Sequence, residues 1–437
     1  QFMKILCIIP PHIPSYFNAG HHLPLYYVAS YLRENITNIS VECVDAAALN
    51  YTWKEICDLL VKGFDLIVLM NDFDGVDTFP RFMNYKKTFC PNAKVITFGR
   101  LSKQIPLFFL QFDLDAIHAL GDYESGVASY VKYLMSADNL LAGVKLPEVK
   151  QIPAGIFLES KDWVLPDVNE IPYISYNFMY RNDLNKFCGI PERQELVVPL
   201  GRGCPFMCEF CDVPPMQGKT ERRLSVDRTV EYIVDAFNKQ PFEYVSFYCP
   251  TFTLNHKWVF EFCEKISQKN EIYSWKCITV LKCLNRKLVQ AMAASGCVRI
   301  SLGIESFTRA AAMGLPKCKQ EILQAFEEIV SICKEYNVEL NCFIILGLPG
   351  DTPEDVEFTI NTCLKHGARI RPTIYTPFQH LREDMSLEEV GEFNRQYFPR
   401  NFLNPEIANK YYKLFYALKH DRPTTVTRNI PIRKVTV

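Results

Sequence analysis

Three cysteines in the segment LVVPLGRGCPFMCEFCDVP carry the strongest chemical signal in the chain. Cys204, Cys208 and Cys211 form a C-x3-C-x2-C triplet that follows an apolar, strand-like segment. Cysteine thiolates are the usual ligands of iron–sulfur clusters, and three of them on one short loop suit a [4Fe-4S] cluster whose fourth iron has no protein ligand. A structural zinc site needs four ligands, and no Cys or His follows closely after Cys211. The spacing therefore predicts a [4Fe-4S] cluster with an open iron, with zinc or three unrelated buried thiols as the alternatives.

The triplet, with Phe210 before its last cysteine, resembles the signature of radical S-adenosylmethionine (SAM) enzymes, and the resemblance covers residues 191–380. It implies that the open iron binds the amino and carboxylate groups of SAM. It also implies that an electron from an external donor cleaves the C–S bond, and that the resulting 5′-deoxyadenosyl radical abstracts hydrogen from a substrate. By the same resemblance, Phe210 flanks the adenine.

Two further segments resemble SAM-binding motifs of that family. SLGIES (301–306) contains Gly303 and Glu305, and the resemblance implies that Glu305 accepts hydrogen bonds from the ribose hydroxyls. FIILGLPGDTPEDVEFTI (343–360) contains Ile345, which would pack on the adenine, and Gly347, which would shape the turn below it; Asp351 stands where Glu is more usual. A solvated glutamate at the strand end, and a helix cap formed by Asp-Thr-Pro-Glu, are the alternatives.

A third segment departs from the family pattern. In FYCPTFTLN (247–255), Cys249 and Thr251 replace the acidic residues that usually bind the SAM amino group, and Lys282 stands where relatives often have an arginine. We expect Thr251 to accept a hydrogen bond from that amino group and Lys282 to hold the SAM carboxylate as a point charge. Cys249 is the candidate catalytic thiol that quenches a substrate radical. A buried structural cysteine and an exposed lysine are the alternatives.

Alternating strands and helices must position these residues. Six strand-like segments, with helices between them, begin at residues 195, 243, 274, 298, 339 and 368. Six such units fit the open partial (β/α)6 TIM barrel of the radical SAM family, with the active site at the carboxyl ends of the strands. The first 140 residues alternate in the same way, which predicts an α/β fold with a doubly wound, flavodoxin-like parallel sheet. We expect residues 141–190 to be a proline-rich linker, 191–380 the radical SAM core and 381–437 a small helical extension.

The first 140 residues also resemble the cobalamin-binding-type domain found ahead of many radical SAM domains. The match is incomplete, because Asn71, Asp72, Phe73 and Arg100 stand at strand ends where small residues usually admit the cofactor. We expect these bulky or charged side chains to fill the crevice, so that the enzyme turns over without cobalamin. His21 and His22 have no carboxylate or thiol nearby in the sequence, which indicates substrate-lining or exposed side chains.

The composition and net charge indicate which classes of binding partner to expect. The chain has 437 residues, 48% hydrophobic and 22% charged, with a net charge of −1. This balance offers no basic surface for nucleic acid or an anionic membrane, and favours a small-molecule substrate. The 17 cysteines are scattered irregularly, which predicts reduced core thiols, and neither a signal peptide nor a membrane span is evident, which together predict a cytoplasmic protein. Only Cys363 follows Cys342, so the C-terminal extension cannot ligate a second cluster; the oligomeric state stays open.

The expected function is therefore hydrogen abstraction from a small polar metabolite by a radical SAM enzyme. Size and layout resemble a radical SAM diol dehydratase of aminoglycoside biosynthesis, which favours sugar dehydration. The alternative is a cobalamin-dependent radical SAM C-methyltransferase. A non-catalytic protein that retains the fold is the third hypothesis.

Overall fold

The computed structural model describes residues 2–15, 17–136, 140–182, 189–308, 312, 314–394, 396–420 and 429–432. Contacts divide the chain into two compact units. Unit 1 comprises Gln1–Tyr176, Pro215–Gly218 and Pro377–Asn394, and unit 2 comprises Asn177–Pro214, Lys219–Thr376 and Arg395–Val437. A search of the described helices finds none with the length and apolarity of a membrane span.

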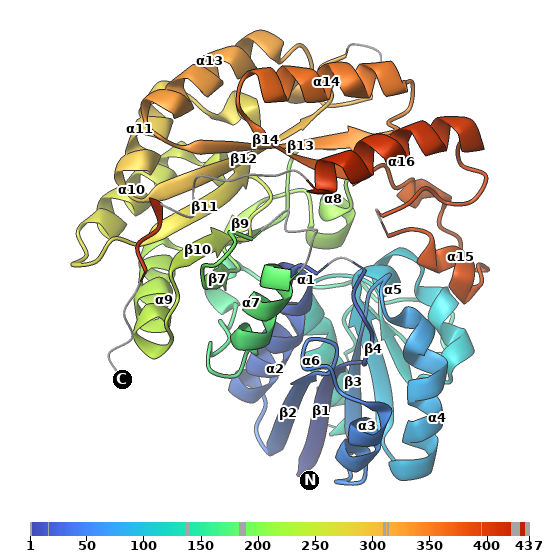
Figure 1. Cartoon of the computed structure of the whole chain (residues 1–437). Coiled ribbons are helices and arrows are strands. Elements are labelled where there is room, and N and C mark those ends of the chain that lie inside the picture. Colours follow the sequence, from blue (N-terminus) through green and yellow to red (C-terminus); the bar gives the residue numbers. More distant parts are fainter. Residues whose placement is uncertain are drawn as a thin grey trace. The chain divides into compact units, whose positions relative to one another are not determined.

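Unit 1 is a six-stranded sheet between two layers of helices (Figure 1). The strand order is β2-β1-β3-β4-β5-β6, in which neighbours are parallel except for the antiparallel β5–β6 pair. Helix α2 packs against α6, and α3 packs against α4. The bounds are β1 (Met3–Ile9), α1 (Ala19–His22), α2 (Pro24–Asn35), β2 (Ile39–Asp45), α3 (Trp53–Leu60), β3 (Leu66–Asn71), α4 (Phe79–Phe89), β4 (Lys94–Gly99), α5 (Arg100–Gln104), η2 (Pro106–Phe112), β5 (Ala116–His118), α6 (Tyr123–Leu134) and β6 (Val144–Lys145).

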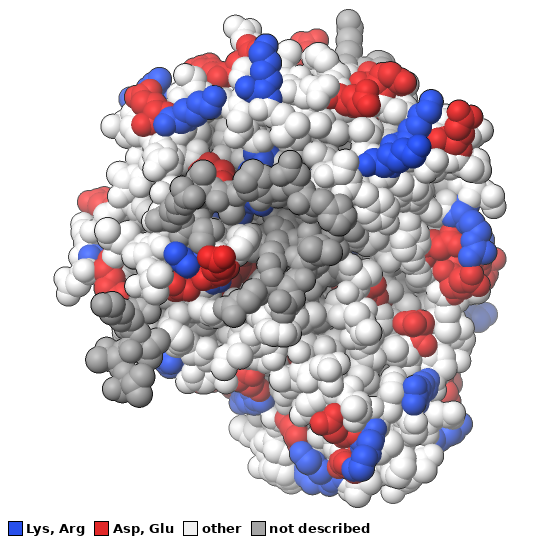
Figure 2. Space-filling model, viewed as in Figure 1, with Lys and Arg blue, Asp and Glu red and all other residues white. Residues whose placement is uncertain are grey.

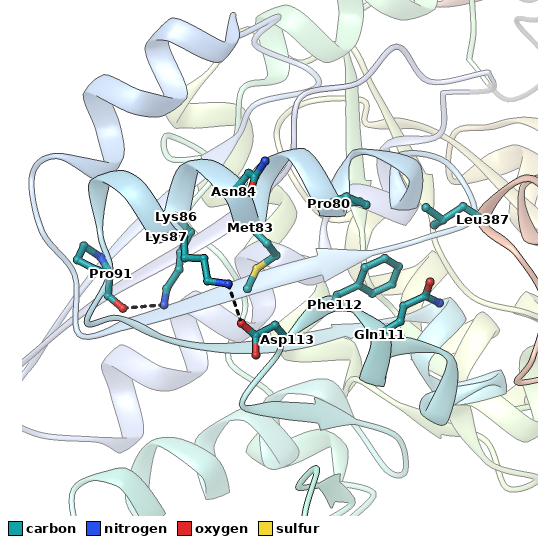
Figure 3. A pocket seen from close by; sticks show the side chains of 10 residues that line it. All are labelled: Pro80, Met83, Asn84, Lys86, Lys87, Pro91, Gln111, Phe112, Asp113 and Leu387. Atoms are coloured by element: carbon teal, nitrogen blue, oxygen red, sulfur yellow. Dashed lines mark hydrogen bonds and ion pairs between the residues drawn. The ribbon is translucent and has the colours of Figure 1, made fainter.

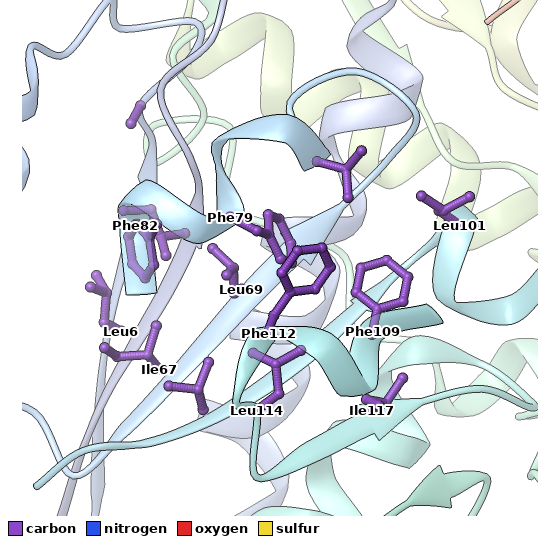
Figure 4. Close-up of a cluster of buried hydrophobic side chains, with 14 of the residues drawn as sticks. Leu6, Ile67, Leu69, Phe79, Phe82, Leu101, Phe109, Phe112, Leu114 and Ile117 are labelled. Carbon is purple, nitrogen blue, oxygen red and sulfur yellow. The ribbon is translucent and has the colours of Figure 1, made fainter. Parts of the chain in front are cut away.

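The expected flavodoxin-like sheet is thus confirmed, and its strands are apolar because both faces are covered. Every residue of β3 is buried, as a parallel strand between two helical layers requires. One large cluster joins β3 and β4 to α3, α4 and η2, with Phe79, Phe109 and Phe112 at its centre (Figure 4). These rings meet at tilted or edge-to-face angles with centroids 5.6 to 5.9 Å apart, the geometry that aromatic pairs prefer.

The first part of the expected linker packs with unit 1 instead of joining two domains. Residues 141–176 belong to unit 1, and Val144 and Lys145 add the antiparallel edge strand β6 to β5. Gly143 and Gly155 lie so close to Leu120 that a Cβ atom at either position would approach Leu120 backbone atoms within 2.0 to 2.3 Å. Small residues therefore permit this close packing, which a proline-rich composition alone does not reveal.

Unit 2 contains the expected six-stranded parallel sheet, in the order β14-β13-β12-β11-β10-β7, with helices on its outer face (Figure 1). The bounds are α7 (Tyr173–Asn182, which begins in unit 1), β7 (Glu195–Val198), β8 (Gly201–Arg202), β9 (Arg222–Arg223), α9 (Val226–Lys239), β10 (Tyr244–Phe247), η4 (Phe252–Leu254), α10 (His256–Ser267), β11 (Ser274–Thr279), η5 (Leu281–Cys283), α11 (Arg286–Ala294), β12 (Cys297–Glu305), η6 (Lys317–Lys319), α13 (Leu323–Glu335), β13 (Glu339–Leu346), α14 (Pro353–Lys365) and β14 (Arg369–Ile374). Strand order follows chain order, as in a partial barrel.

Side chains alternate between the two faces of this sheet. On β13, Cys342 faces outward, because it contacts Cys363 of the covering helix α14. Asn341, Phe343 and Ile345 therefore lie on the opposite, inner face. Residues paired in register on neighbouring strands lie on the same face of the sheet. On β14, the residues paired with these three are Arg369, Arg371 and Thr373, which therefore also lie on the inner face.

The predicted C-terminal extension contains two described helices, α15 (Leu387–Gly391) in unit 1 and α16 (Pro405–His420) in unit 2, with turns and irregular segments around them. Most of the predicted tail, residues 422–437, lies outside the described residues. On the face shown in Figure 2, acidic and basic side chains are interspersed over the described surface and form no broad basic patch.

Unit 1 also carries a surface hollow of about 420 Å³ beside α4 (Figure 3). The lysines on its rim are already engaged, since Lys86 donates a hydrogen bond to the Pro91 carbonyl at 2.9 Å and Lys87 lies 3.6 Å from the Asp113 carboxylate. The hollow shares no residue with the candidate sites, and we assign it no role.

Candidate active site

The three cysteines lie on one loop that leaves the short strand β8. Cys204 and Cys208 are buried, Cys211 is partly exposed, and the Cys211 N–H donates a 3.0 Å hydrogen bond to the Cys208 carbonyl. This hydrogen bond closes a turn between Cys208 and Cys211. Cys204 Sγ lies 3.9 Å from Thr251 Oγ1, so the loop after β10 adjoins the cysteine loop.

The donor set fits an iron–sulfur cluster. Among the described residues, no three His, Cys, Asp or Glu side chains lie close enough together to hold a single metal ion. A cubane cluster has a different requirement, because each thiolate binds a different iron and the sulfurs stand further apart. Burial raises the pKa of the Cys208 thiol to about 12, and the nearby Lys319 ammonium opposes that rise. Iron binding would deprotonate the thiol, as coordination does for cysteine ligands in general.

A buried ion pair lies beside the cysteines. Lys319 Nζ donates hydrogen bonds to Glu305 Oε1 at 2.5 Å and to the Gly303 carbonyl at 3.2 Å, and it lies 5.6 Å from the centre of the Phe210 ring. Burial alone would lower the pKa of Lys319, but Glu305, Cys208 and Cys211 raise it, so the ammonium stays charged. The pair thus places one cation and one carboxylate next to the cluster loop.

Two backbone features make room for this ion pair. Glu305 has a φ of 62°, a left-handed conformation that costs energy for a residue with a side chain, and it lies at a register shift between β12 and β13. A Cβ atom at Gly303 would lie 2.5 Å from Lys319 Nζ and 2.7 Å from Glu305 Oε1. Glycine at 303 and the strained Glu305 therefore serve the same arrangement, and such strain is typical of functional sites.

Lys319 was not foreseen from the sequence, where Lys282 was the candidate cation. Lys282 instead donates hydrogen bonds to the carbonyls of Lys317 and Gln320, at 3.2 and 3.1 Å. It therefore holds η6, the short helix that carries Lys319, and does not itself reach toward the Glu305 carboxylate. The only sequence signal for Lys319 was its place in a KCK run after GIES, which does not separate it from Lys317.

Cys249 lies in a tightly packed position. Its thiol is buried, and a Cβ atom at Gly201 would lie 2.8 Å from Cys249 Sγ. Burial raises the pKa of Cys249 to about 12, while Arg223, whose Nη2 lies 3.7 Å from Sγ, opposes the rise. This environment matches the structural alternative for Cys249, and the candidate catalytic role in radical quenching finds no support in it.

Arg223 is a second residue that the sequence did not single out. Its guanidinium pairs with Glu221 and donates hydrogen bonds to the carbonyls of Phe252 and Thr251, at 2.8 and 3.0 Å. It also lies over the Trp258 ring at 5.0 Å. Arg223 therefore anchors the loop after β10 on which Thr251 is placed.

The turn after β13 has partners of its own. Ile345 is buried on the inner face of β13, where the predicted adenine contact requires it. Gly347 has a φ of 85°, and a Cβ atom there would lie 2.6 Å from the Phe398 ring, so the space beside this glycine is taken by the C-terminal extension. The Gly347 N–H donates to Asp351 Oδ2 at 3.3 Å, and burial raises the pKa of Asp351 to about 7. The predicted helix cap is present as a Thr352–Asp355 capping box at the start of α14.

In unit 1, the residues expected to block cobalamin are placed differently from the prediction. The Asn71 side chain accepts hydrogen bonds from the N–H groups of Leu101 and Ser102, at 3.1 and 3.0 Å, and so caps α5. Phe73 is buried in the large apolar cluster of unit 1. Both side chains are thus part of the domain interior, because each has a partner there. Asp72 and Arg100 form an ion pair at 3.3 Å, about one-fifth exposed, at the carboxyl ends of β3 and β4.

His22 has a carboxylate partner that is remote in the sequence. Its Nδ1 lies 2.7 Å from Asp45 Oδ2, and the same oxygen accepts a 2.8 Å hydrogen bond from the Tyr176 hydroxyl. Asp45 is fully buried at the end of β2. Burial alone would lower the pKa of His22 and raise that of Asp45, but their mutual attraction reverses both shifts. The expectation of an exposed His22 is therefore wrong, since the side chain is buried.

This pair predicts a defined pH dependence of stability. The raised pKa of His22 contributes stability below the ordinary value of 6.5, which is lost as pH rises through the folded-state pKa. The lowered pKa of Asp45 contributes stability above 3.8, which is lost as pH falls through its folded-state pKa. We expect the wild-type protein to have a higher unfolding free energy than His22→Gln. This difference should be largest between pH 3.8 and 6.5 and should shrink at lower and at higher pH. Urea unfolding of both proteins across pH checks this, and an excess that is flat with pH would show that the pair is not ionised.

Comparisons with known proteins agree with this geometry. A model of the radical SAM superfamily matches residues 198–363. An uncharacterized methyltransferase, PH0819 of Pyrococcus horikoshii, is 26% identical over 394 residues, which are 87% of this chain and 82% of the relative. The hopanoid C-2 methylase of Rhodopseudomonas palustris is 26% identical over 161 residues, 36% of this chain and 30% of that protein.

Two solved structures share the fold. One is TsrM of Kitasatospora setae, a radical SAM methyltransferase solved with cobalamin and a [4Fe-4S] cluster. The match has a TM-score of 0.67 at 14% identity, and it covers 86% of this chain and 74% of the TsrM chain. The cobalamin-dependent radical SAM enzyme OxsB has a TM-score of 0.66 at 15% identity and covers 83% of this chain, which spans only 52% of OxsB. Residues 198–363 therefore carry a radical SAM domain, which agrees with the cysteine loop and the partial barrel. The flavodoxin-like unit precedes this domain in the chain, and the fold as a whole resembles those of TsrM and OxsB.

Proposed function

We propose that this radical SAM enzyme is a cobalamin-dependent methyltransferase that acts on a small molecule. The observation that carries the proposal is the combination, in one chain, of the cysteine loop beside the Glu305–Lys319 pair with a flavodoxin-like unit of the kind found in TsrM and OxsB. The curated relatives reported above are named as a methyltransferase and a methylase, which favours methyl transfer over the dehydration that the sequence first indicated.

In unit 2, the candidate site residues each have a role in binding SAM. Cys204, Cys208 and Cys211 ligate the cluster, which when bound supplies the electron for cleavage of the SAM C–S bond. The Lys319 ammonium pairs with the SAM carboxylate, Glu305 accepts hydrogen bonds from the ribose hydroxyls, and Ile345 and Phe210 contact the adenine. Thr251, anchored through Arg223, offers an oxygen to the amino group.

In unit 1, the described carboxyl edge fits a corrin better than its sequence indicated. Asn71 and Phe73 do not obstruct the edge, because the first caps α5 and the second lies in the core. The partly exposed Asp72–Arg100 pair offers both acceptors and donors to the amide side chains of a corrin. The edge includes the point between β1 and β3 at which strand order reverses, where sheets of this class bind ligands. Cobalamin, when bound, would supply the methyl group.

The test uses anaerobically purified, cluster-reconstituted protein with and without hydroxocobalamin. We expect cobalamin absorbance to remain with the protein after gel filtration, and reduced protein with SAM to form both 5′-deoxyadenosine and S-adenosylhomocysteine. The second product appears only when SAM gives up its methyl group, so its formation should depend on cobalamin. If the protein forms only 5′-deoxyadenosine, and forms it equally well without cobalamin, the result would contradict the methyltransferase proposal and favour a dehydratase.

A pair of variants localises the cofactor to the described edge. Arg100→Ala removes one half of the Asp72–Arg100 pair and should weaken cobalamin retention. Arg81→Ala is the matched control, since Arg81 is exposed on α4 and lies over the Trp53 ring at 4.7 Å. Equal retention by the two variants would remove Arg100 from the cobalamin site.

A further inference from the structure

The inner face of the unit 2 sheet carries an unusual set of charges. Arg299 Nε lies 2.7 Å from Glu339 Oε1, and Arg369 Nη1 lies 3.8 Å from the same oxygen. Lys276 Nζ lies 3.6 Å from Glu195 Oε2. Arg371 lies on the same face, and its guanidinium lies 4.7 Å from the centre of the Phe343 ring.

The hydrogen bonds of Arg369 are incomplete within the described part of the chain. Its side chain is 8% exposed, and its Nε and Nη1 have no hydrogen-bond partner among the described residues. Burial and the neighbouring Arg299 lower the pKa of Arg369 to about 10, which still leaves it charged at neutral pH. A buried cation with unsatisfied donors is costly to the fold, so its retention calls for a partner that the described residues do not supply.

The position of Arg369 relates this charge to the active site. Arg369 and Arg371 lie on β14, the edge strand, on the same face as Thr373, which pairs in register with Ile345. Four residues of strand separate Arg369 from Thr373, about 13 Å at the usual rise of a parallel strand. An elongated molecule along β14 could therefore contact both guanidinium groups at one end while its other end lies at the carboxyl edge, near Ile345.

We propose that the inner face of β14 binds an oxyanion of the substrate, a carboxylate or a phosphate, through Arg369 and Arg371. Guanidinium groups recognise both anions through paired N–H donors, and the anion would complete the hydrogen bonds of Arg369. The inference deepens the proposed function by naming an acidic, elongated substrate. The reaction that this substrate undergoes rests on the proposed function, whereas the anion site itself does not.

The test measures anion binding and stability in the full, cluster-loaded chain without reductant, so it does not depend on catalysis. Inorganic phosphate, pyrophosphate and malonate are the probes, and their comparison separates a phosphate site from a carboxylate site. We expect one of them to raise the unfolding temperature of the wild-type protein and of Arg286→Met, in which an exposed arginine paired with Glu335 on the outer helices is removed. Arg369→Met should bind that anion about tenfold or more weakly, the loss expected when a charged hydrogen bond is removed.

A second readout distinguishes a binding site from a structural ion pair. Without anions, Arg369→Met should unfold at a higher temperature than wild type, because the variant removes unsatisfied buried donors and the repulsion from Arg299. Arg369→Lys keeps the charge without the planar fork, and should retain part of the anion response if Arg369→Met fails to fold. A wild-type protein that responds to none of the three anions, or an Arg369→Met protein that is less stable but responds like wild type, would overturn the inference. Loss of methyl transfer with an intact anion response would instead overturn the proposed function.

Discussion

Replacement of any one of Cys204, Cys208 and Cys211 by serine is expected to abolish SAM cleavage. In the proposed cluster each thiolate would bind a different iron, and the described part of the chain offers no nearby group of three ligands that could take over. Reconstituted wild-type protein should carry about four irons per chain, the content of one [4Fe-4S] cluster, and each variant should carry fewer. Iron and sulfide analysis and the formation of 5′-deoxyadenosine after reduction measure the two effects.

Cys57→Ser is the control for these variants, because Cys57 is a partly buried thiol on α3 of unit 1. It should leave both the iron content and 5′-deoxyadenosine formation unchanged. Activity that survives in one of the three loop variants would remove that cysteine from the cluster.

Replacement of Lys319 by methionine is expected to damage both SAM binding and stability. It leaves the Glu305 carboxylate buried without its cation, and the loss of one partner from a buried pair typically costs about 3 to 5 kcal/mol of unfolding free energy. It also removes the cation proposed to pair with the SAM carboxylate. Equilibrium dialysis with SAM and chemical unfolding measure the two losses separately.

Variants at Glu305 separate structure from SAM binding. Glu305→Ala should weaken SAM binding by about 1 to 3 kcal/mol, the usual loss for a buried charged hydrogen-bond partner. Glu305→Gln combined with Lys319→Met removes both charges, and should recover much of the stability without recovering SAM cleavage. A double variant that is both stable and active would show that the ion pair is structural only.

The cysteine loop and the strand order were predictable from the sequence because they depend on local patterns. A C-x3-C-x2-C loop carries its own spacing, and the six apolar segments from residue 195 onward became β7, β10, β11, β12, β13 and β14 with small shifts at their ends. Buried parallel strands appear in the sequence as apolar runs. The helices between them are recognised by hydrophobic residues that recur at the helical period. The flavodoxin-like sheet of unit 1 was predictable for the same reason.

The partners of buried charged groups were not predictable from local pattern. His22 and Asp45 are 23 residues apart. Lys319 and Glu305 are 14 residues apart, and they meet at a point where Gly303 leaves room for both side chains. The same limit applies to Asn71 and Phe73, whose size indicated an obstructed crevice although one caps a helix and the other lies in a core.

The sequence by itself thus determined the cysteine loop, the two α/β units and the class of chemistry. Only the tertiary structure decided which cation lies beside the cysteine loop, that Lys282 holds η6 and that Cys249 is packed against Gly201. It also decided that the Nε and Nη1 of Arg369 lack hydrogen-bond partners among the described residues. The physical reason is that secondary structure follows from short-range periodicity, whereas the energy of a buried charge depends on which groups the fold brings within about 4 Å of it.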